Sequence, residues 1–292
     1  MRILSFGILV SGNLGKHCLE FILKCQKVNF VLTDKESIGI INLCTVLNIP
    51  IFIGNPRQGK AKGFIDQFDT DIIFSINYIY IVEQDIIKYP KSYAINFHGS
   101  LLPKYRGRSP HVWAIINNEK TTGISAHLIT EECDAGCLIY QEIIPIPEDI
   151  TGAEILTEFK KQYPIVISIV IDMIQKDTIN PVKQDNSKAT WFGKRTPADG
   201  IINWNWQKEQ LRNWIRAQTK LYPGAFTFYN HQKITIYRIE YCDYGFNQFD
   251  ENGIILDIRD GVIVKTPNGA IRILDYDSDI PIEFKKGGMF HG

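Results

Sequence analysis

The chain has 292 residues, a hydrophobic content of 45% and an aromatic content of 12%, which allow a packed core and exclude an intrinsically disordered chain. The length exceeds that of a typical single domain, so we expect two domains. Lys and Arg number 32, as do Asp and Glu, so the formal net charge is zero, and this balance gives no long-range attraction for nucleic acid or an anionic membrane.

Strand-like and helix-like segments alternate through the first part of the chain. The predicted strands are residues 2–10, 29–32, 49–53, 71–77 and 93–97. The predicted helices are residues 14–24, 35–47 and 82–87. This alternation predicts an α/β fold, with a Rossmann-like, mainly parallel sheet and helices on both faces. The run 2–10 lacks a signal-peptide cleavage pattern, so we interpret it as the first buried strand.

The middle of the chain continues this pattern and then changes in composition. We expect a short helix at 110–117, strands at 122–129 and 137–144, and a long helix at 152–176 that Pro164 kinks or interrupts. Residues 180–200 contain Pro181, Asn186, Ser187, Pro197 and Gly200 and are typical of a linker. A further helix is expected at 208–220.

Short β-rich segments fill the last part of the chain. They are residues 225–229, 233–241, 253–258, 261–266 and 270–274. Strands at this spacing predict a small barrel. The resulting domain prediction is a catalytic domain at 1–179, a linker at 180–205 and a β-barrel domain at 206–292.

Cysteine usage and hydrophobicity bear on location. Six cysteines are scattered without regular spacing, which indicates reduced thiols in the cytoplasm, not a disulfide framework. The chain has no apolar run of the roughly 18 residues that cross a bilayer. We therefore expect a cytoplasmic protein with no membrane partner.

The most informative motif is N-F-H-G-S-L-L-P-K-Y-R-G at 96–107. Asn96, His98 and Ser100 are two apart, so their side chains point the same way if the strand conformation persists. Polar groups at the end of a buried strand are where an open α/β sheet places its chemistry. Asp134 adds a carboxylate on a Gly-containing loop between two predicted strands. An amide, an imidazole and a carboxylate together suit acyl transfer.

The sequence resembles the folate-dependent formyltransferase family over nearly its whole length. The similarity rests on the 96–107 motif, T-G-I-S at 122–125, C-D-A-G at 133–136 and Gln141. It extends to W-F-G-K-R-T-P-A-D-G-I-I-N-W at 191–204 and to Y-P-G-A-F at 222–226. Among its branches, the chain is most similar to the nucleotide-sugar N-formyltransferases.

The resemblance implies a role for individual residues. The catalytic residues it implies are Asn96, His98 and Asp134. The formyl donor it implies is 10-formyltetrahydrofolate, held by the loops that contain Ile76, Asn77, Tyr78 and Cys133. We predict substrate contacts from the basic loop after His98, through Ser100, Lys104, Arg106 and Arg108. Ser100 has a second interpretation as the cap of the next turn, and the second domain is expected to be OB-like.

Formyl transfer requires an amine to attack an amide-like carbonyl. Asn96 has an amide N–H that can stabilise the developing negative oxygen, an interaction typically worth about 3 kcal/mol. His98 can donate to the same oxygen or carry protons. Asp134 can set the imidazole tautomer or hold a water that carries the proton. No covalent enzyme intermediate is required.

Other interpretations of the motifs are weaker. Cys133 and Cys137 lack a second pair with zinc-like spacing, so we predict no metal site. Gly12 and Gly15 do not make up G-x-G-x-x-G and fit a tight strand-to-helix turn. The remaining histidines have no evident partner in the sequence: His17, His111, His127, His231 and His291.

The acceptor is inferred from charge and from departures within the family. A tRNA-binding enzyme needs a basic surface, and this chain is neutral and lacks the basic, Gly-rich insertion of the tRNA branch after its second strand. Arg108 matches the sugar branch. We therefore predict that the small-molecule substrate is a nucleotide-linked amino deoxysugar and that nucleic acid is not a partner. A homodimer is compatible with the resemblance. The alternatives are methionyl-tRNA formyltransferase, 10-formyltetrahydrofolate hydrolase and a non-catalytic folate-binding protein.

Overall fold

The computed structural model describes residues 4–292, which form two compact units. The first unit contains the chain up to Pro110, Thr122–Ile144 and Thr157–Phe192, and the second contains His111–Thr121, Pro145–Leu156 and Gly193–Gly292. Each unit is therefore assembled from several pieces of the chain. The domain boundaries that we derived from composition stay a prediction.

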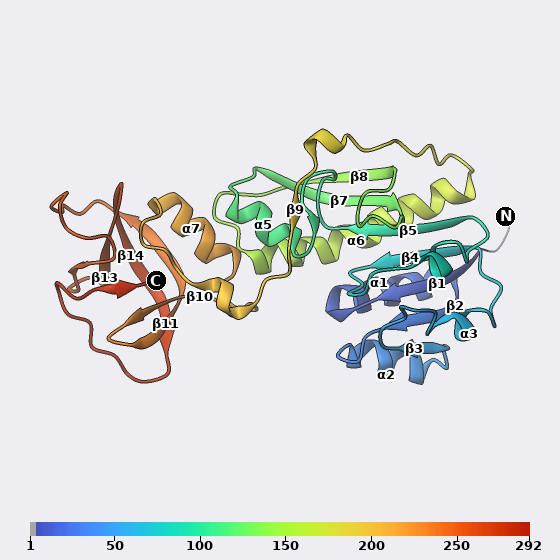
Figure 1. Ribbon diagram of the computed structural model, residues 1–292, viewed down its shortest axis with the longest axis horizontal. Coiled ribbons are helices and arrows are strands. Elements are labelled where there is room, and N and C mark those ends of the chain that lie inside the picture. The colour runs from blue at the N-terminus through green and yellow to red at the C-terminus, as the bar shows by residue number, and fades with distance from the viewer. Residues whose placement is uncertain (1–3) are drawn as a thin grey trace. The chain divides into compact units, whose positions relative to one another are not determined.

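A seven-stranded sheet in the order β3-β2-β1-β4-β5-β7-β8 forms the centre of the first unit (Figure 1). Its strands are β1 (Ser5–Val10), β2 (Lys27–Thr33), β3 (Ile51–Ile53), β4 (Ile72–Ile76), β5 (Tyr93–His98), β7 (Thr121–Leu128) and β8 (Leu138–Pro145). Strands β1 to β5 pair in parallel, whereas β7 runs antiparallel to β5. The predicted Rossmann-like, mainly parallel sheet is confirmed. Residues 2 and 3 of the predicted first strand lie outside the described residues.

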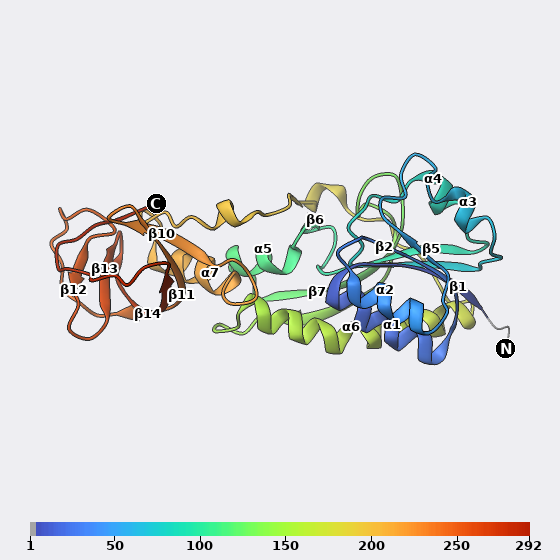
Figure 2. The same cartoon turned by 90° about the horizontal axis from the view of Figure 1, so that it is seen from below.

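Helices cover both faces of this sheet. They are α1 (Gly12–Cys25), α2 (Ile38–Val46), α3 (Lys62–Ile65), α4 (Gln84–Ile87) and α6 (Gly152–Gln175). Figure 2 shows α1, α2 and α6 on one face and α3 and α4 on the other. Pro164 lies inside α6 without ending it.

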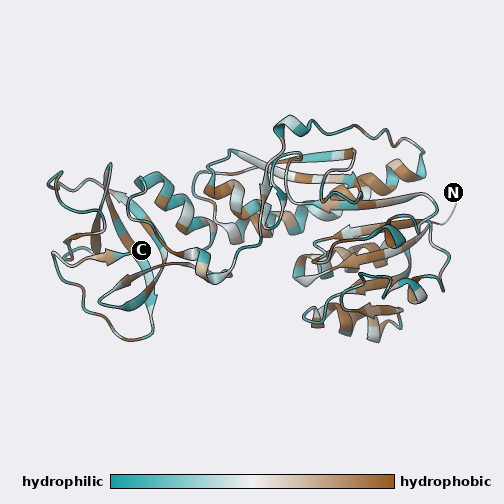
Figure 3. Ribbon diagram, viewed as in Figure 1, coloured by the Kyte–Doolittle hydropathy of each residue, from teal (hydrophilic) through white to brown (hydrophobic). Residues whose placement is uncertain are grey.

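Hydrophobicity explains why the sheet is central. Every residue of β1 and β4 is buried, as expected for parallel strands that are covered on both faces. Figure 3 shows hydrophobic residues on the strands of this sheet and mostly hydrophilic residues in the loops. Polar residues at strand ends are therefore exceptions that require a structural or chemical reason.

A two-stranded parallel sheet joins two loops of the first unit. Strand β6 (Arg106–Gly107) pairs with β9 (Trp191–Phe192). The sequence pattern predicted neither strand, because two residues are too few to show an alternation of buried and exposed positions. Strand β6 lies in the 96–107 motif, whereas β9 lies in the segment that we predicted as a linker.

The second unit is built on a six-stranded antiparallel sheet in the order β12-β13-β14-β11-β10-β15. Its strands are β10 (Ala225–Tyr229), β11 (Gln232–Cys242), β12 (Ile255–Asp257), β13 (Val262–Thr266), β14 (Gly269–Ser278) and β15 (Phe290–His291). The unit also contains most of α5 (Pro110–Ile116), α7 (Lys208–Ala217) and the short 3₁₀ helix η2 (Pro197–Gly200). A second short 3₁₀ helix, η1 (Asn186–Lys188), belongs to the first unit.

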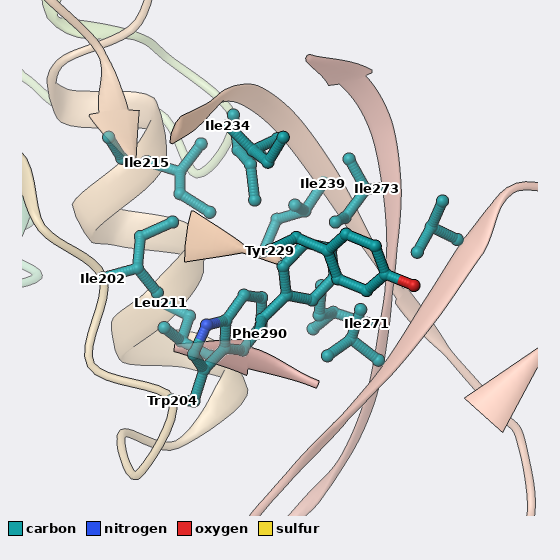
Figure 4. Packing of buried hydrophobic residues seen from close by; sticks show 14 of the residues in the cluster. Ile202, Trp204, Leu211, Ile215, Tyr229, Ile234, Ile239, Ile271, Ile273 and Phe290 are labelled. Carbon is teal, nitrogen blue, oxygen red and sulfur yellow. The ribbon is translucent and has the colours of Figure 1, made fainter. Parts of the chain in front are cut away.

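The sheet of the second unit curls around one hydrophobic core. Backbone hydrogen bonds of 2.8 Å join Ile255 of β12 to Gly287 and Gly288, so the two edges of the sheet approach each other. Inside, Trp204 stacks on Phe290 with ring centroids 5.3 Å apart, beneath Leu211 of α7 (Figure 4). This arrangement confirms the predicted small barrel domain.

Candidate active site

Neighbouring strands of the first unit carry three polar side chains of the candidate site. Asn96 and His98 are two apart on β5 and therefore point to the same face of the sheet. Strand β7 pairs with β5 in a register that places His127 directly opposite Asn96. The Asn96 Nδ2 atom lies 3.1 Å from Nε2 of His127. The expectation that His127 has no partner was wrong, because the partner is set by strand register.

Asp134 completes the cluster from the loop between β7 and β8. Its Oδ1 atom lies 3.6 Å from Nδ1 of His98 and 3.6 Å from Nε2 of His127. Its Oδ2 atom accepts a hydrogen bond of 2.8 Å from the Gly107 N–H. Burial alone would raise the pKa of Asp134, but the two imidazoles and the Gly107 N–H hold that pKa well below its usual range. Asp134 is therefore ionised at neutral pH.

Backbone carbonyls determine the tautomers of both histidines. The Nε2 atom of His98 lies 2.8 Å from the Tyr105 carbonyl, and Nδ1 of His127 lies 2.8 Å from the Leu128 carbonyl. A carbonyl oxygen only accepts, so each of these ring nitrogens carries the hydrogen. In the neutral rings, the lone pairs are on Nδ1 of His98 and Nε2 of His127. These are the two nitrogens that face Asp134.

The amide of Asn96 is oriented by the same contacts. Its Nδ2 atom faces two acceptors, Nε2 of His127 at 3.1 Å and Oδ1 of Asp134 at 3.4 Å. An amide oxygen in that position would face two acceptors without a hydrogen, so the amino group must occupy it. The three residues predicted as catalytic therefore lie together, and His127 is a fourth member of the cluster.

Long-range contacts hold the loop that carries Asp134. Asp134 has a φ of +56°, a left-handed conformation that Asp adopts more readily than most residues. A Cβ atom on Gly136 would lie 1.8 Å from the Leu128 carbonyl oxygen, so only glycine permits the loop to lie this close to the end of β7. The sequence shows this glycine but not the contact that requires it.

The residues predicted to hold the donor lie at the end of β4 and beside Asp134. Ile76 ends β4 and is buried, and Asn77 is exposed, with a φ of +53° and its Nδ2 donating to the Ser11 carbonyl. The Tyr78 hydroxyl is buried, and the described residues offer it no hydrogen-bond partner. Cys133 is exposed, but its Sγ atom lies 3.4 Å from Oδ2 of Asp134. Desolvation of the thiol, reinforced by Asp134, raises the pKa of Cys133 to about 12.

The residues predicted to bind substrate differ in their surroundings. Ser100 is buried and its hydroxyl donates to the Lys104 carbonyl at 2.7 Å, which agrees with the interpretation of a turn cap. Lys104 is exposed, and Arg108 is half-buried and donates to the Ile79 carbonyl at 2.9 Å. Arg106 is fully buried, which does not fit contact with a substrate.

Two further residues of the recognised motifs have structural partners. The Ser125 hydroxyl donates to the Ser100 carbonyl at 2.6 Å and accepts the Leu102 N–H at 3.1 Å. Gln141 donates to Ser125 and to the Leu102 carbonyl. These contacts fix the path of the chain immediately after His98.

Two features that are absent from the described residues bear on other functions. Among residues 4–292, no three His, Cys, Asp or Glu side chains are grouped as metal ligands. In the same range, no helix combines the length and the hydrophobicity that spanning a membrane requires.

Comparison with protein families gives two matches. A model described as "Formyl transferase" matches residues 27–171, and one described as "Formyl transferase, C-terminal domain" matches residues 194–279. A curated relative, the bifunctional polymyxin resistance protein ArnA of Wigglesworthia glossinidia brevipalpis, is 37% identical over 227 residues. That match covers 77% of this chain but 34% of ArnA, so the chain spans about a third of its relative's length.

Solved structures share the fold over nearly the whole chain. WlaRD, a sugar 3N-formyl transferase crystallised with dTDP and 5-N-formyl-THF, matches with a TM-score of 0.69 and 21% identity, covering 97% of this chain and 100% of WlaRD. An N-formyltransferase from Helicobacter canadensis, in complex with folinic acid and dTDP-3-aminofucose, matches with a TM-score of 0.69 and 22% identity, covering 94% and 99% of the two chains. At these identities the two matches establish a common fold.

Proposed function

The chain belongs to the folate-dependent formyltransferase family, and from this premise we propose that it transfers a formyl group from 10-formyltetrahydrofolate to the amine of a nucleotide-linked amino deoxysugar. The observation that carries the proposal is the cluster of Asn96, His98, His127 and Asp134, in which one ionised carboxylate lies 3.6 Å from two imidazole nitrogens. The relatives with sugar substrates support the choice of acceptor.

The charge of the cluster suits the uptake of one proton. An ionised Asp134 beside two unprotonated imidazoles would give the buried site one negative charge, and a single proton on either ring neutralises that charge. An amine that attacks a formyl carbonyl must lose a proton. In the unprotonated ring, His98 Nδ1 has its lone pair towards the site and accepts that proton, and Asp134 then stabilises the imidazolium. As the bond between the formyl carbon and the folate nitrogen breaks, the imidazolium returns the proton to this leaving nitrogen.

Asn96 acts on the carbonyl oxygen of the formyl group. Its amino group now faces His127 and Asp134, with the longer contact, 3.4 Å, to Asp134. The formyl oxygen replaces this weaker acceptor and gains a hydrogen bond where negative charge develops. Because the histidine tautomers already fix the amide, the donor N–H needs little reorganisation.

The segment after β4 fits the proposed donor. The buried Tyr78 hydroxyl lacks a partner among the described residues, and the next residue, Ile79, exposes 40% of its surface. A flat ring system with polar edges supplies both an apolar cover and a hydrogen-bond partner at such a place. The bound donor supplies the activated formyl group.

The acceptor is tested with the purified chain, 10-formyltetrahydrofolate and a panel of dTDP-, UDP- and GDP-linked amino sugars. We expect one nucleotide sugar to gain the mass of one formyl group, and the Asp134→Asn variant to give no product in the same time. Formylation of methionyl-tRNA but of no sugar would transfer the assignment to the tRNA branch. Release of formate without any acceptor would indicate a hydrolase.

A further inference from the structure

Residues 182–192, which we call the strap, attach to both loops of the candidate site. At one end, Val182 forms two backbone hydrogen bonds of 2.8 Å with Leu138, at the start of β8. At the other end, Trp191 and Phe192 form β9 and pair with β6. The strap therefore connects the chain after Asp134 with the chain after His98, within the first unit.

Gln184 is the buried residue of the strap, with 5% of its surface exposed. Its Nε2 atom donates to the carbonyl of Asp134 at 2.8 Å and to that of Gly136 at 2.7 Å. Both amide hydrogens are thus used on the loop that carries the catalytic carboxylate. Asp134 has a left-handed backbone conformation, which persists only where surrounding contacts hold it. The hydrogen bond from Gln184 to the Asp134 carbonyl is such a contact.

Arg106 connects Gln184 to the 96–107 motif. Its Nη2 atom donates to Oε1 of Gln184 at 2.8 Å and to Oδ1 of Asn186 at 2.7 Å, and its guanidinium lies 5.2 Å from the centre of the Trp191 ring. With no exposed surface, Arg106 holds the strap against the motif loop. Arg106 therefore acts inside the protein, through charge-assisted hydrogen bonds to the strap.

Thr190 of the strap, through its side chain and its backbone, also holds the partners of His98 and Asp134. The Tyr105 N–H donates to Oγ1 of Thr190 at 2.8 Å, and the Tyr105 carbonyl is the one that fixes the tautomer of His98. The neighbouring Arg106 N–H donates to the Thr190 carbonyl at 2.8 Å. Gly107, which follows in β6, donates its N–H to Asp134.

We infer that the strap is a positioning element for the catalytic cluster, and that Gln184 is its main positioning residue. Gln184 sets the place of Asp134 through two backbone carbonyls, while the strap sets His98 through Tyr105. The inference rests on the proposed function for its effect on turnover, but the geometric part concerns the free protein. A displacement of about 1 Å at a catalytic group can reduce a rate about a hundredfold.

The test uses two substitutions in the full-length chain. Gln184→Met keeps the size of the side chain and removes both donors and the acceptor. Gln184→Glu keeps an acceptor for Arg106 and removes the donors, so it stays informative if the first variant does not fold. Lys183→Ala, an exposed neighbour in the strap, is the matched control.

Two readouts separate positioning from a general loss of structure. We expect kcat to fall roughly 10- to 100-fold in both Gln184 variants, with the KM of either substrate changed by less than about threefold, and no change in Lys183→Ala. In the free protein, we expect carbon-13 NMR of the carboxyl groups to show a higher pKa for Asp134 in Gln184→Met, because the carboxylate moves away from the imidazoles and the Gly107 N–H.

The outcomes distinguish the inference from the proposed function. If the wild-type chain formylates no acceptor, the proposed function fails, and the pKa of Asp134 alone decides on the strap. A folded Gln184 variant that keeps the wild-type pKa of Asp134, or a kcat within threefold of wild type in an active enzyme, overturns the inference.

Discussion

Replacing Asp134 with asparagine tests the central electrostatic contact of the site. The substitution preserves the size of the side chain, and the amide oxygen can still accept the Gly107 N–H that now binds Oδ2 at 2.8 Å. It removes the negative charge that lies 3.6 Å from His98 Nδ1 and from His127 Nε2. The fold should therefore survive, whereas the protonated state of either imidazole loses its counter-ion.

The size of the effect follows from the distance. Two unit charges about 4 Å apart interact by about 4 kcal/mol at an effective dielectric constant near 20. A rise of roughly 1.36 kcal/mol in the activation barrier lowers a rate by a factor of ten. If the imidazolium of His98 forms in the rate-limiting transition state, the loss of this interaction lowers kcat by about a thousandfold. The KM of the acceptor should change little, because Asp134 is covered by the histidines and by Gly107.

The assay follows formyl transfer at saturating concentrations of both substrates, either by the absorbance of the tetrahydrofolate that forms or by mass spectrometry of the sugar product. Glu131→Gln is the matched control, since it removes an exposed carboxylate three residues away in the same loop. We expect the control to keep wild-type kcat. An Asp134→Asn enzyme with kcat within tenfold of wild type, or an equal loss in Glu131→Gln, would refute the assignment of Asp134 as counter-ion.

Three more predictions concern the same cluster. His127→Leu should lower kcat by about a hundredfold, because Asn96 loses the acceptor 3.1 Å away; steady-state kinetics with circular dichroism as a folding check measure this. Gly107→Ala should reduce the free energy of unfolding by about 1–3 kcal/mol, since the φ of Gly107 is +99° and the new Cβ would lie 2.3 Å from the Phe192 carbonyl oxygen. Urea titration measures this loss, and Gly193→Ala is the control, because a Cβ at Gly193 meets nothing within 4 Å. Ionised Asp134 contributes its full stabilisation above the ordinary carboxyl pKa of about 4, and this contribution decreases as the pH falls towards the lowered pKa of Asp134 in the folded state. In urea titrations at decreasing pH, the free energy of unfolding should therefore fall less steeply for Asp134→Asn than for wild type.

Local patterns in the sequence were sufficient for most of the fold. Continuous apolar runs such as residues 5–10 identified the buried parallel strands, and the polar spacing at Asn96 and His98 marked the end of one of them. These features depend on residues adjacent in the chain, where period and composition carry the information. Asp134 was located by its motif, and the structure brings it to the other two residues.

Features that depend on long-range pairing were not accessible from the sequence. His127 lies opposite Asn96 only in one register of β5 and β7, and a shift of one residue would place it on the other face of the sheet. Gln184 lies in a segment whose composition is typical of a linker. Its two donated hydrogen bonds, to residues about fifty positions earlier, have no local signature.

The unpredicted contacts explain how the site can be ready before its substrates bind. A buried carboxylate between two imidazoles has several arrangements of similar energy unless each ring and the carboxylate are fixed separately. Here the carbonyls of Tyr105 and Leu128 fix the rings, and Gln184 fixes the backbone of Asp134. Hydrogen-bond donors that are already aimed at the developing charge stabilise a transition state without the cost of reorganisation. The proposed catalytic residues therefore depend on contacts that have no chemical role of their own. Substitutions at those contacts should lower kcat before they lower the affinity for either substrate.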